Sequence, residues 1–197
     1  ILLYDATHVP VGDDQKQHLE LCRDIAQRFN NDYKVENFFK VPEPLIQKQF
    51  SRIMSLKDGL KKMSKSEPSD LSRINLTDNK DDIINKIKKA KTDSLPMPST
   101  IDGLEDRAEA KNLLGIYSSL SGLTLEKSIL EFSGKNFSEF KNSLAEILVD
   151  KIIPISVEIK KLLKDKKYLE QILSEGHKKA NDIASNKLKK IHELVGF

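Results

Sequence analysis

Cysteine is nearly absent from this sequence. Cys22 is the only one among 197 residues, so no disulfide can form within the chain, and such sparing use of cysteine fits a reducing compartment. Apolar runs long enough to cross a membrane are also absent. The apolar run that begins at Ile1 is too short for a signal peptide and has the wrong flanking residues. We therefore expect a cytoplasmic protein with no membrane partner.

Familiar metal and phosphate motifs are missing too. The sequence has no C-x-x-C and no H-E-x-x-H pattern, so we expect no tightly bound protein metal. It has no G-x-x-x-x-G-K-[ST] pattern either, which excludes a P-loop nucleotide site. Any phosphate binding must therefore use another kind of loop.

A surplus of one charge is lacking as well. The 33 basic residues nearly balance 30 acidic ones, which leaves a formal net charge of +3. A nucleic-acid surface, if the chain has one, must therefore be local. Hydrophobic residues make up 38% of the chain and charged residues 32%, which indicates a globular protein with one sizeable core or two small ones.

The hydrophobic pattern predicts a partial α/β nucleotide-binding segment of Rossmann type followed by an all-α helical bundle, mostly helical overall. Short apolar runs at Ile1–Tyr4 and Ser51–Leu56 predict two strands, and the helical spacing of apolar residues predicts a helix over Asp14–Asn30, capped by Asp13 or Asp14. From about Asp81 onward only helical patterns occur, with an interruption expected near Pro154.

Two polar loops follow the predicted strands. In parallel sheets, ligands sit beyond the carboxyl ends of the strands, so the loops Gly12–Gln15 and Gly59–Asp70 could line one crevice. The first loop offers carboxylates that suit ribose hydroxyls or an ammonium group, although its spacing alone favours a capped helix with solvated acids.

The second loop carries two lysines three residues apart, with hydroxyl groups between and after them. Lys62 and Lys65, with Ser64 and Ser66, could grip a polyphosphate. The composition alone favours the other interpretation, a solvated, lysine-rich surface loop.

Lys62–Ser66 spells KMSKS, and this stretch resembles the signature loop of class I aminoacyl-tRNA synthetases. The stretches VPVGDDQKQHLELCRDIAQRFN, RIMSL, KKMSKSEPS and LLGIYSSLSG resemble the tryptophanyl-tRNA synthetase family. The tyrosyl enzymes share the KMSKS loop and a G-x-D-Q turn but not the surrounding sequence.

The resemblance implies a reaction and its substrates. The family activates L-tryptophan with ATP and Mg²⁺ to the adenylate, releases pyrophosphate and transfers the amino acid to tRNA(Trp); it is homodimeric. The resemblance also implies roles for individual residues of this sequence. Lys62 and Lys65 would stabilise charge during catalysis. ATP would be bound by Gly12, Asp13, Asp14, Ile53, Lys62, Met63, Ser64, Lys65 and Ser66, and tryptophan by Val9, Val11 and Gln15.

The resemblance also implies a division into two domains. Residues 1–70 would be the C-terminal portion of the catalytic nucleotide-binding domain, and residues 71–197 a helical domain that binds the tRNA anticodon. Lysines that could contact tRNA phosphates are Lys178, Lys179, Lys187 and Lys190.

The second family signature, H-x-G-H, is not found in the sequence. We therefore expect a C-terminal fragment that is inactive by itself, because the missing signature and the acid that pairs with the indole N–H would precede Ile1. A non-catalytic RNA-binding or interaction module derived from a synthetase, or a tyrosyl-tRNA synthetase, are the alternatives.

Overall fold

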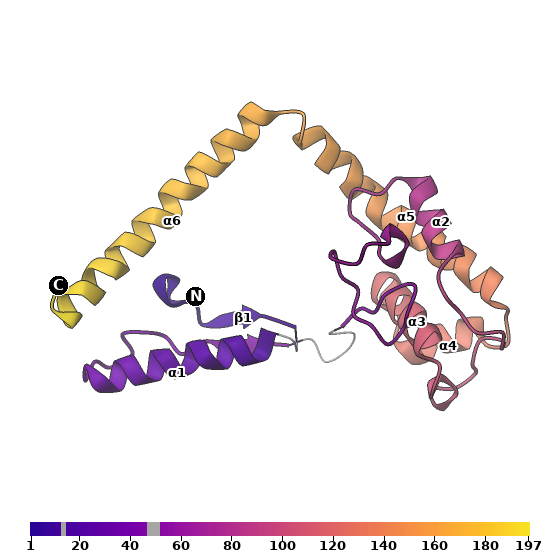
Figure 1. Ribbon diagram of the computed structural model, residues 1–197, viewed down its shortest axis with the longest axis horizontal. Helices are drawn as coiled ribbons and strands as arrows, with labels where there is room; N and C mark the ends of the chain where they lie inside the picture. Colours follow the sequence, from indigo (N-terminus) through magenta and orange to yellow (C-terminus); the bar gives the residue numbers. More distant parts are fainter. Residues whose placement is uncertain (13–14, 47–51) are drawn as a thin grey trace. The chain divides into compact units, whose positions relative to one another are not determined.

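Helices dominate the computed structural model of the chain (Figure 1), which describes residues 1–12, 15–46 and 52–197. The chain divides into two compact units. Unit 1 contains Ile1–Ser51 together with Asp165–Phe197, and unit 2 contains Arg52–Lys164. The predicted fold class, a partial α/β segment with a helical remainder, is confirmed.

Unit 1 contains a parallel pair of short strands joined by a helix. Strand β1 is His8–Pro10, strand β2 is Glu43–Leu45, and Val9 lies opposite Pro44. Helix α1, Lys16–Asp32, lies between them in the chain, as a crossover between parallel strands requires. One N-terminal expectation needs correction. The run expected as a strand forms a 3₁₀ turn, η1 (Leu2–Tyr4), and β2 lies in a segment with no strand pattern.

Helix α1 buries the face that its sequence pattern predicts. Leu19 and Ala26 are buried, while Cys22 and Phe29 are partly so. The helix begins at Lys16, with Gln15 in the capping position but without a side-chain capping bond. The predicted caps, Asp13 and Asp14, lie outside the described residues.

Helix α6, Lys166–Val195, belongs to unit 1 and packs against η1. The apolar run of η1 therefore packs on a helix instead of entering the sheet. A single lysine, Lys187, links α6 to the N-terminal segment. Its Nζ lies 2.7 Å from Asp5 Oδ1, donates to the carbonyl of Phe38 and stands 4.2 Å from the centre of the Phe38 ring.

Unit 2 is built on four helices around one apolar core. They are α2 (Lys80–Lys88), α3 (Ala108–Ser121), α4 (Leu125–Phe132) and α5 (Phe137–Leu162). Helices α2 and α5 lie side by side (Figure 1). The largest fully buried side chains include Phe132 and Phe140, which pack edge to face.

Local signals set several helix ends in unit 2. Gly122 ends α3 in the left-handed conformation, with φ of 73°, which glycine adopts without steric cost. Thr124 caps α4 by accepting from Lys127 N. The interruption predicted at Pro154 is wrong, because α5 continues through it. Its neighbours Ile152 and Ile153 pack against the core, which offsets the hydrogen bond that proline removes.

Candidate nucleotide-binding site

A hairpin positions the KMSKS loop in unit 2. Met54 and Lys62 form an isolated antiparallel bridge. It is flanked by bonds from Ser55 N to Lys61 O, at 2.8 Å, and from Met63 N to Ile53 O, at 3.0 Å. We call residues 53–63 the hairpin. The strand predicted at 51–56 is thereby corrected: for residues 52–56 it is reduced to this single bridge, and Ser51 lies outside the described residues.

The tip of the hairpin rests on helix α3. A Cβ atom on Gly59 would stand 2.6 Å from the backbone of Ala108 and Glu109, so only glycine allows this close approach. The Glu109 carboxylate forms an ion pair of 2.7 Å with Lys91 Nζ. Hydrogen bonding from Lys91, more than any other contact, lowers the pKa of Glu109. Helix α3 therefore fixes where the turn lies.

The KMSKS loop itself, Lys62–Ser66, combines an anchored residue with exposed ones. The side chain of Met63 packs against the apolar core of unit 2, whereas Lys62 and Lys65 are exposed. The hydroxyl groups of Ser64 and Ser66 share a hydrogen bond of 2.7 Å, and Ser66 N donates to Ser64 Oγ. The loop thus presents two ammonium groups and two hydroxyl groups on a short turn.

A buried lysine holds the segment that follows the loop. Lys86 on α2 has a side chain only 4% exposed, and its Nζ lies 2.6 Å from both Asp70 Oδ2 and Asp78 Oδ2. Burial disfavours its charge, but hydrogen bonds with the two aspartates outweigh this and raise the pKa of Lys86. The bond from Lys86 and a second from Asn75 lower the pKa of Asp70. The ion pair with Lys86 and the hydrogen bond from Asn75 therefore fix the position of Asp70, four residues beyond the loop.

The other predicted ligand residues lie in unit 1. Val9 is a residue of β1, and Val11 N donates to Leu45 O at 3.2 Å. Gln15 N donates to Gly12 O, and its side chain contacts the ring of His18 at 3.1 Å. Asp13 and Asp14 lie outside the described residues. The structure thus groups Val9, Val11, Gly12 and Gln15 in one unit, and Ile53 with Lys62–Ser66 in the other.

The lysines predicted to bind tRNA differ in their surroundings. Lys178, Lys179 and Lys190 are exposed on α6. Lys187 has a side chain only 12% exposed and pairs with Asp5. Composition alone gives no sign of this difference.

Three supporting residues escaped the sequence analysis: Lys86, Glu109 and Asn112. Ile83, Lys86, Ile87 and Ala90 share the helical spacing of a buried stripe, so a lysine at that position was a usable signal. Asn112 stands beside Leu113 and Leu114 in a helix that is buried along most of its length, which is also an unusual place for an amide.

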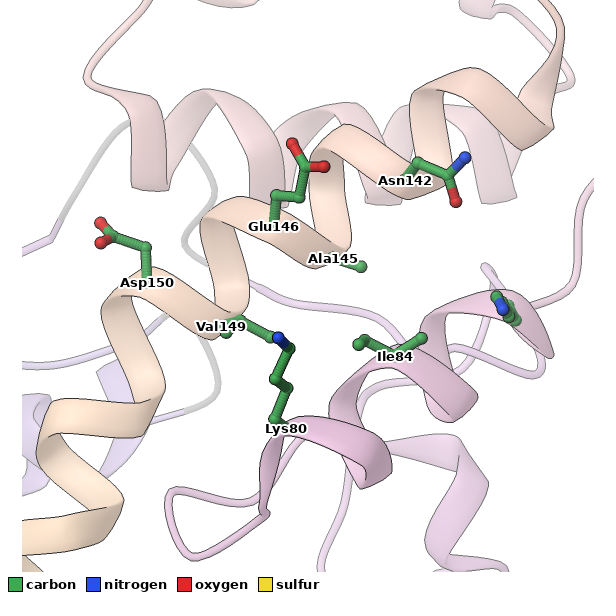
Figure 2. Close-up of a pocket in the computed structure, with 8 residues that line it drawn as sticks. Lys80, Ile84, Asn142, Ala145, Glu146, Val149 and Asp150 are labelled. Carbon is green, nitrogen blue, oxygen red and sulfur yellow. The ribbon is translucent and has the colours of Figure 1, made fainter.

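A cavity of about 480 Å³ lies between α2 and α5 (Figure 2). Lys80 and Lys88 on α2 and the acids Glu146 and Asp150 on α5 are among the residues that line it. None of the predicted ligand residues lines it. The candidate site therefore does not coincide with this cavity.

Metal-ligating side chains and membrane-spanning helices are the two remaining features to consider in the described part of the chain. Across residues 1–12, 15–46 and 52–197, no three His, Cys, Asp or Glu side chains are grouped so that they could hold a metal ion. Over the same residues, every helix is too short or too polar to cross a membrane.

The family follows from comparison with known proteins. Residues 1–152 match the model of the class I tRNA synthetases for tryptophan and tyrosine (W and Y). The chain belongs to this family.

The individual relatives point to the tryptophan branch. The chain is 53% identical to tryptophan–tRNA ligase of Caulobacter vibrioides over all 197 residues, which span 57% of that protein. It resembles the crystal structure of tryptophanyl-tRNA synthetase from Mycoplasma pneumoniae with a TM-score of 0.83 and 33% identity, covering 100% of this chain and 58% of the other. The enzyme from Campylobacter jejuni, complexed with ADP and tryptophan, matches with a TM-score of 0.70 and 29% identity, covering 100% of this chain and 59% of that one. The chain thus spans less than two thirds of the length of these relatives.

The charges around Asp70 predict how stability depends on pH. The pKa of Asp70 is lowered in the folded state, so its stabilising contribution is present above the unfolded value, about 4, and is lost as pH falls through the folded value. We expect Asp70→Asn to lower stability at pH 7 and to flatten the acid side of the profile, below about pH 4. Urea unfolding at a series of pH values measures both effects.

Asp81→Asn is the matched control, because Asp81 is an exposed acid at the start of α2, the helix that carries Lys86. It should keep the wild-type acid profile. An unchanged profile in Asp70→Asn would contradict the role assigned to the Lys86–Asp70 pair.

Proposed function

We propose that this chain carries the KMSKS half of a tryptophan–tRNA ligase, which activates tryptophan with ATP and transfers it to tRNA(Trp). The observation that carries this proposal is the KMSKS loop on its hairpin in unit 2, in a chain 53% identical to such a ligase. The relative from Campylobacter jejuni, complexed with ADP and tryptophan, supports the same pair of small substrates.

The chemistry of activation suits the groups that the loop presents. Attack of the tryptophan carboxylate on the α-phosphate of ATP forms a carboxyl–phosphate bond and breaks the bond to pyrophosphate, which leaves with the electron pair. Negative charge then grows on the pyrophosphate. Lys62 and Lys65 would stabilise that charge more strongly in the transition state than in the ground state.

The remaining residues bind and orient the substrates. The serine hydroxyls of the loop can donate to phosphate oxygens, and Mg²⁺, which binds in such reactions largely through substrate phosphates, would neutralise part of the charge. The backbone at Ile53 would contact adenine, and the Gly12–Gln15 turn the ribose and the tryptophan amino group. Val9 and Val11 would form walls of the indole pocket. Positioning and electrostatics suffice for this kind of reaction.

The proposal includes the wider setting of the enzyme. We assign residues 1–70 to the nucleotide-binding domain and residues 71–197 to a tRNA anticodon-binding domain, in a cytoplasmic homodimer. The exposed lysines of α6 support tRNA binding, because phosphate contacts need accessible ammonium groups.

The direct test is ATP–pyrophosphate exchange by a chimera that joins residues 1–197 to the part of the Caulobacter vibrioides ligase that this chain does not cover. We expect exchange that depends on tryptophan and not on tyrosine, and little or none from residues 1–197 alone. Tyrosine-dependent exchange would indicate the tyrosyl enzyme instead, and tRNA binding without any exchange would indicate a non-catalytic module.

Lys65→Ala tests the charge-stabilising role in the same chimera. Because Lys65 acts on charge that develops in the transition state, we expect kcat to fall by about 100-fold or more while the Kd for ATP changes far less. Single-turnover kinetics and equilibrium ATP binding measure the two quantities. Lys61→Ala is the matched control, because it is an exposed lysine of the same hairpin, outside the KMSKS loop. Equal losses in kcat and ATP affinity would refute the role of Lys65.

The lysines of α6 give a separate test with tRNA(Trp). We expect the double reversal Lys178→Glu and Lys190→Glu to weaken binding and to reduce the slope of log K against log[salt] by about 1 for each lost phosphate contact. Fluorescence anisotropy at several salt concentrations measures the slope. Lys34→Glu, at an exposed lysine in the 1–70 segment, is the control; an identical slope in all variants would contradict the proposal.

A further inference from the structure

Asn112, on helix α3, binds both backbone groups of one hairpin residue. Its Nδ2 donates to Met54 O and its Oδ1 accepts from Met54 N, each at 2.9 Å. The residue is only 8% exposed. A primary amide is the side chain that can satisfy an N–H and a C=O of the same residue at once.

This contact completes the open edge of the hairpin. The two bonds that flank the Met54–Lys62 bridge come from neighbouring residues, so Met54 and Lys62 form a non-hydrogen-bonded pair and the backbone groups of Met54 face away from the partner strand. Asn112 occupies the place of a third strand. Without it, a partly buried donor and acceptor would be left unsatisfied, which is costly.

Helix α3 also contacts the hairpin at its turn. Gly59, at the turn, lies against the backbone of Ala108 and Glu109, and Glu109 and Asn112 are three residues apart, so they share one face of the helix. One face of α3 thus binds the hairpin at its turn and near its open end. A slide of the hairpin along α3 would break both contacts together.

The position of Met54 matters for the candidate site. The residue before it, Ile53, accepts a hydrogen bond from Met63 N, and Met63 is itself the second residue of the KMSKS loop. Fixing Met54 therefore fixes the backbone proposed to contact adenine and the start of the phosphate-binding loop as one piece. On the other side of the loop, Lys86 fixes Asp70.

We propose that Asn112 is a positioning residue for ATP activation, which holds the hairpin on α3 so that Ile53 and the loop Lys62–Ser66 engage the nucleotide in a fixed relation. The inference rests on the proposed function. Asn112 touches no substrate in this scheme; it acts through Met54. Freedom of the loop to close on the triphosphate is then confined to the residues between Met63 and Asp70.

Asn112→Leu tests the inference in the chimera described above, because leucine keeps a similar volume and removes both hydrogen bonds. We expect faster hydrogen–deuterium exchange in peptides that cover 53–63, with α5 peptides unchanged. In ATP–pyrophosphate exchange, we expect kcat/KM for ATP to fall by about 10- to 100-fold, with the KM for tryptophan unchanged within about twofold. Asn112→Asp keeps the acceptor for Met54 N but sets a buried carboxylate oxygen against Met54 O, so it should fall at least as far as Asn112→Leu.

Ser118→Ala is the matched control, since Ser118 is buried on the same helix and donates to Leu123 O at 2.7 Å, away from the hairpin. It should leave the hairpin peptides and the ATP parameters as in the wild type. If Asn112→Leu matches Ser118→Ala in both readouts, or if it weakens ATP and tryptophan equally, the inference is wrong. If the wild-type chimera shows no tryptophan-dependent exchange, the proposed function fails, while the hydrogen exchange of 53–63 still decides whether Asn112 fixes the hairpin.

Discussion

The satisfaction of backbone hydrogen bonds in the segment Met54–Leu56 is the constraint on which the KMSKS half of the molecule depends. These residues lack a regular sheet, yet their polar groups must find partners when they are withdrawn from water. Asn112 binds both groups of Met54, while Leu56 donates to Ser72 O and accepts from Lys91 N. The partners come from three separate stretches of sequence. Satisfying this short segment therefore ties the hairpin to α3, to the turn at Ser72 and to the end of α2.

Ion pairs fix the segment on the other side of the KMSKS loop. Lys86 is buried with two aspartates, and a buried ion pair stabilises a fold only when its members are well hydrogen-bonded. Here Asn75 donates to both Asp70 and Asp78, so the aspartates have further partners. Removing Lys86 alone would leave Asp78, which is itself buried, without its cation. The network accordingly serves less to add stability than to specify where the chain lies just after the loop.

Local signals allowed the helices to be predicted, whereas the strands depended on partners far along the chain. The ends at Gly122 and Thr124 follow from conformations and capping bonds that neighbouring residues decide. Strands β1 and β2 are three residues long and each contains a proline, so the sequence there has the features of a turn. Likewise, the packing of α6 in unit 1 depends on Lys187 meeting Asp5 and Phe38, which no local pattern reveals.

The candidate site likewise contains residues that the sequence predicts and residues that it does not. The KMSKS motif could be recognised because its lysines and serines are consecutive in the sequence. The residues that hold the loop in place are isolated polar side chains on helices, which form no such motif. Lys86 occupies a buried position of an otherwise apolar stripe, and Asn112 stands beside two buried leucines. A polar residue in such a place must find a partner or destabilise the fold. The partner, however, is backbone or an acid elsewhere in the chain, and its identity emerges only when the chain has folded.

A loop as polar as Lys62–Ser66 cannot be positioned by burying itself, because Met63 is its only large apolar side chain. It is positioned from its two ends instead, by Asn112 through the hairpin and by Lys86 through Asp70. This arrangement keeps Lys62 and Lys65 exposed, and most of the residues from Lys65 to Asp70 are exposed as well. Loops that bind and release ligands belong to the less stable parts of a fold, and anchoring the ends limits the conformational entropy lost when such a loop closes. Directional hydrogen bonds outside the loop thereby reconcile a defined position with the exposure of its lysines.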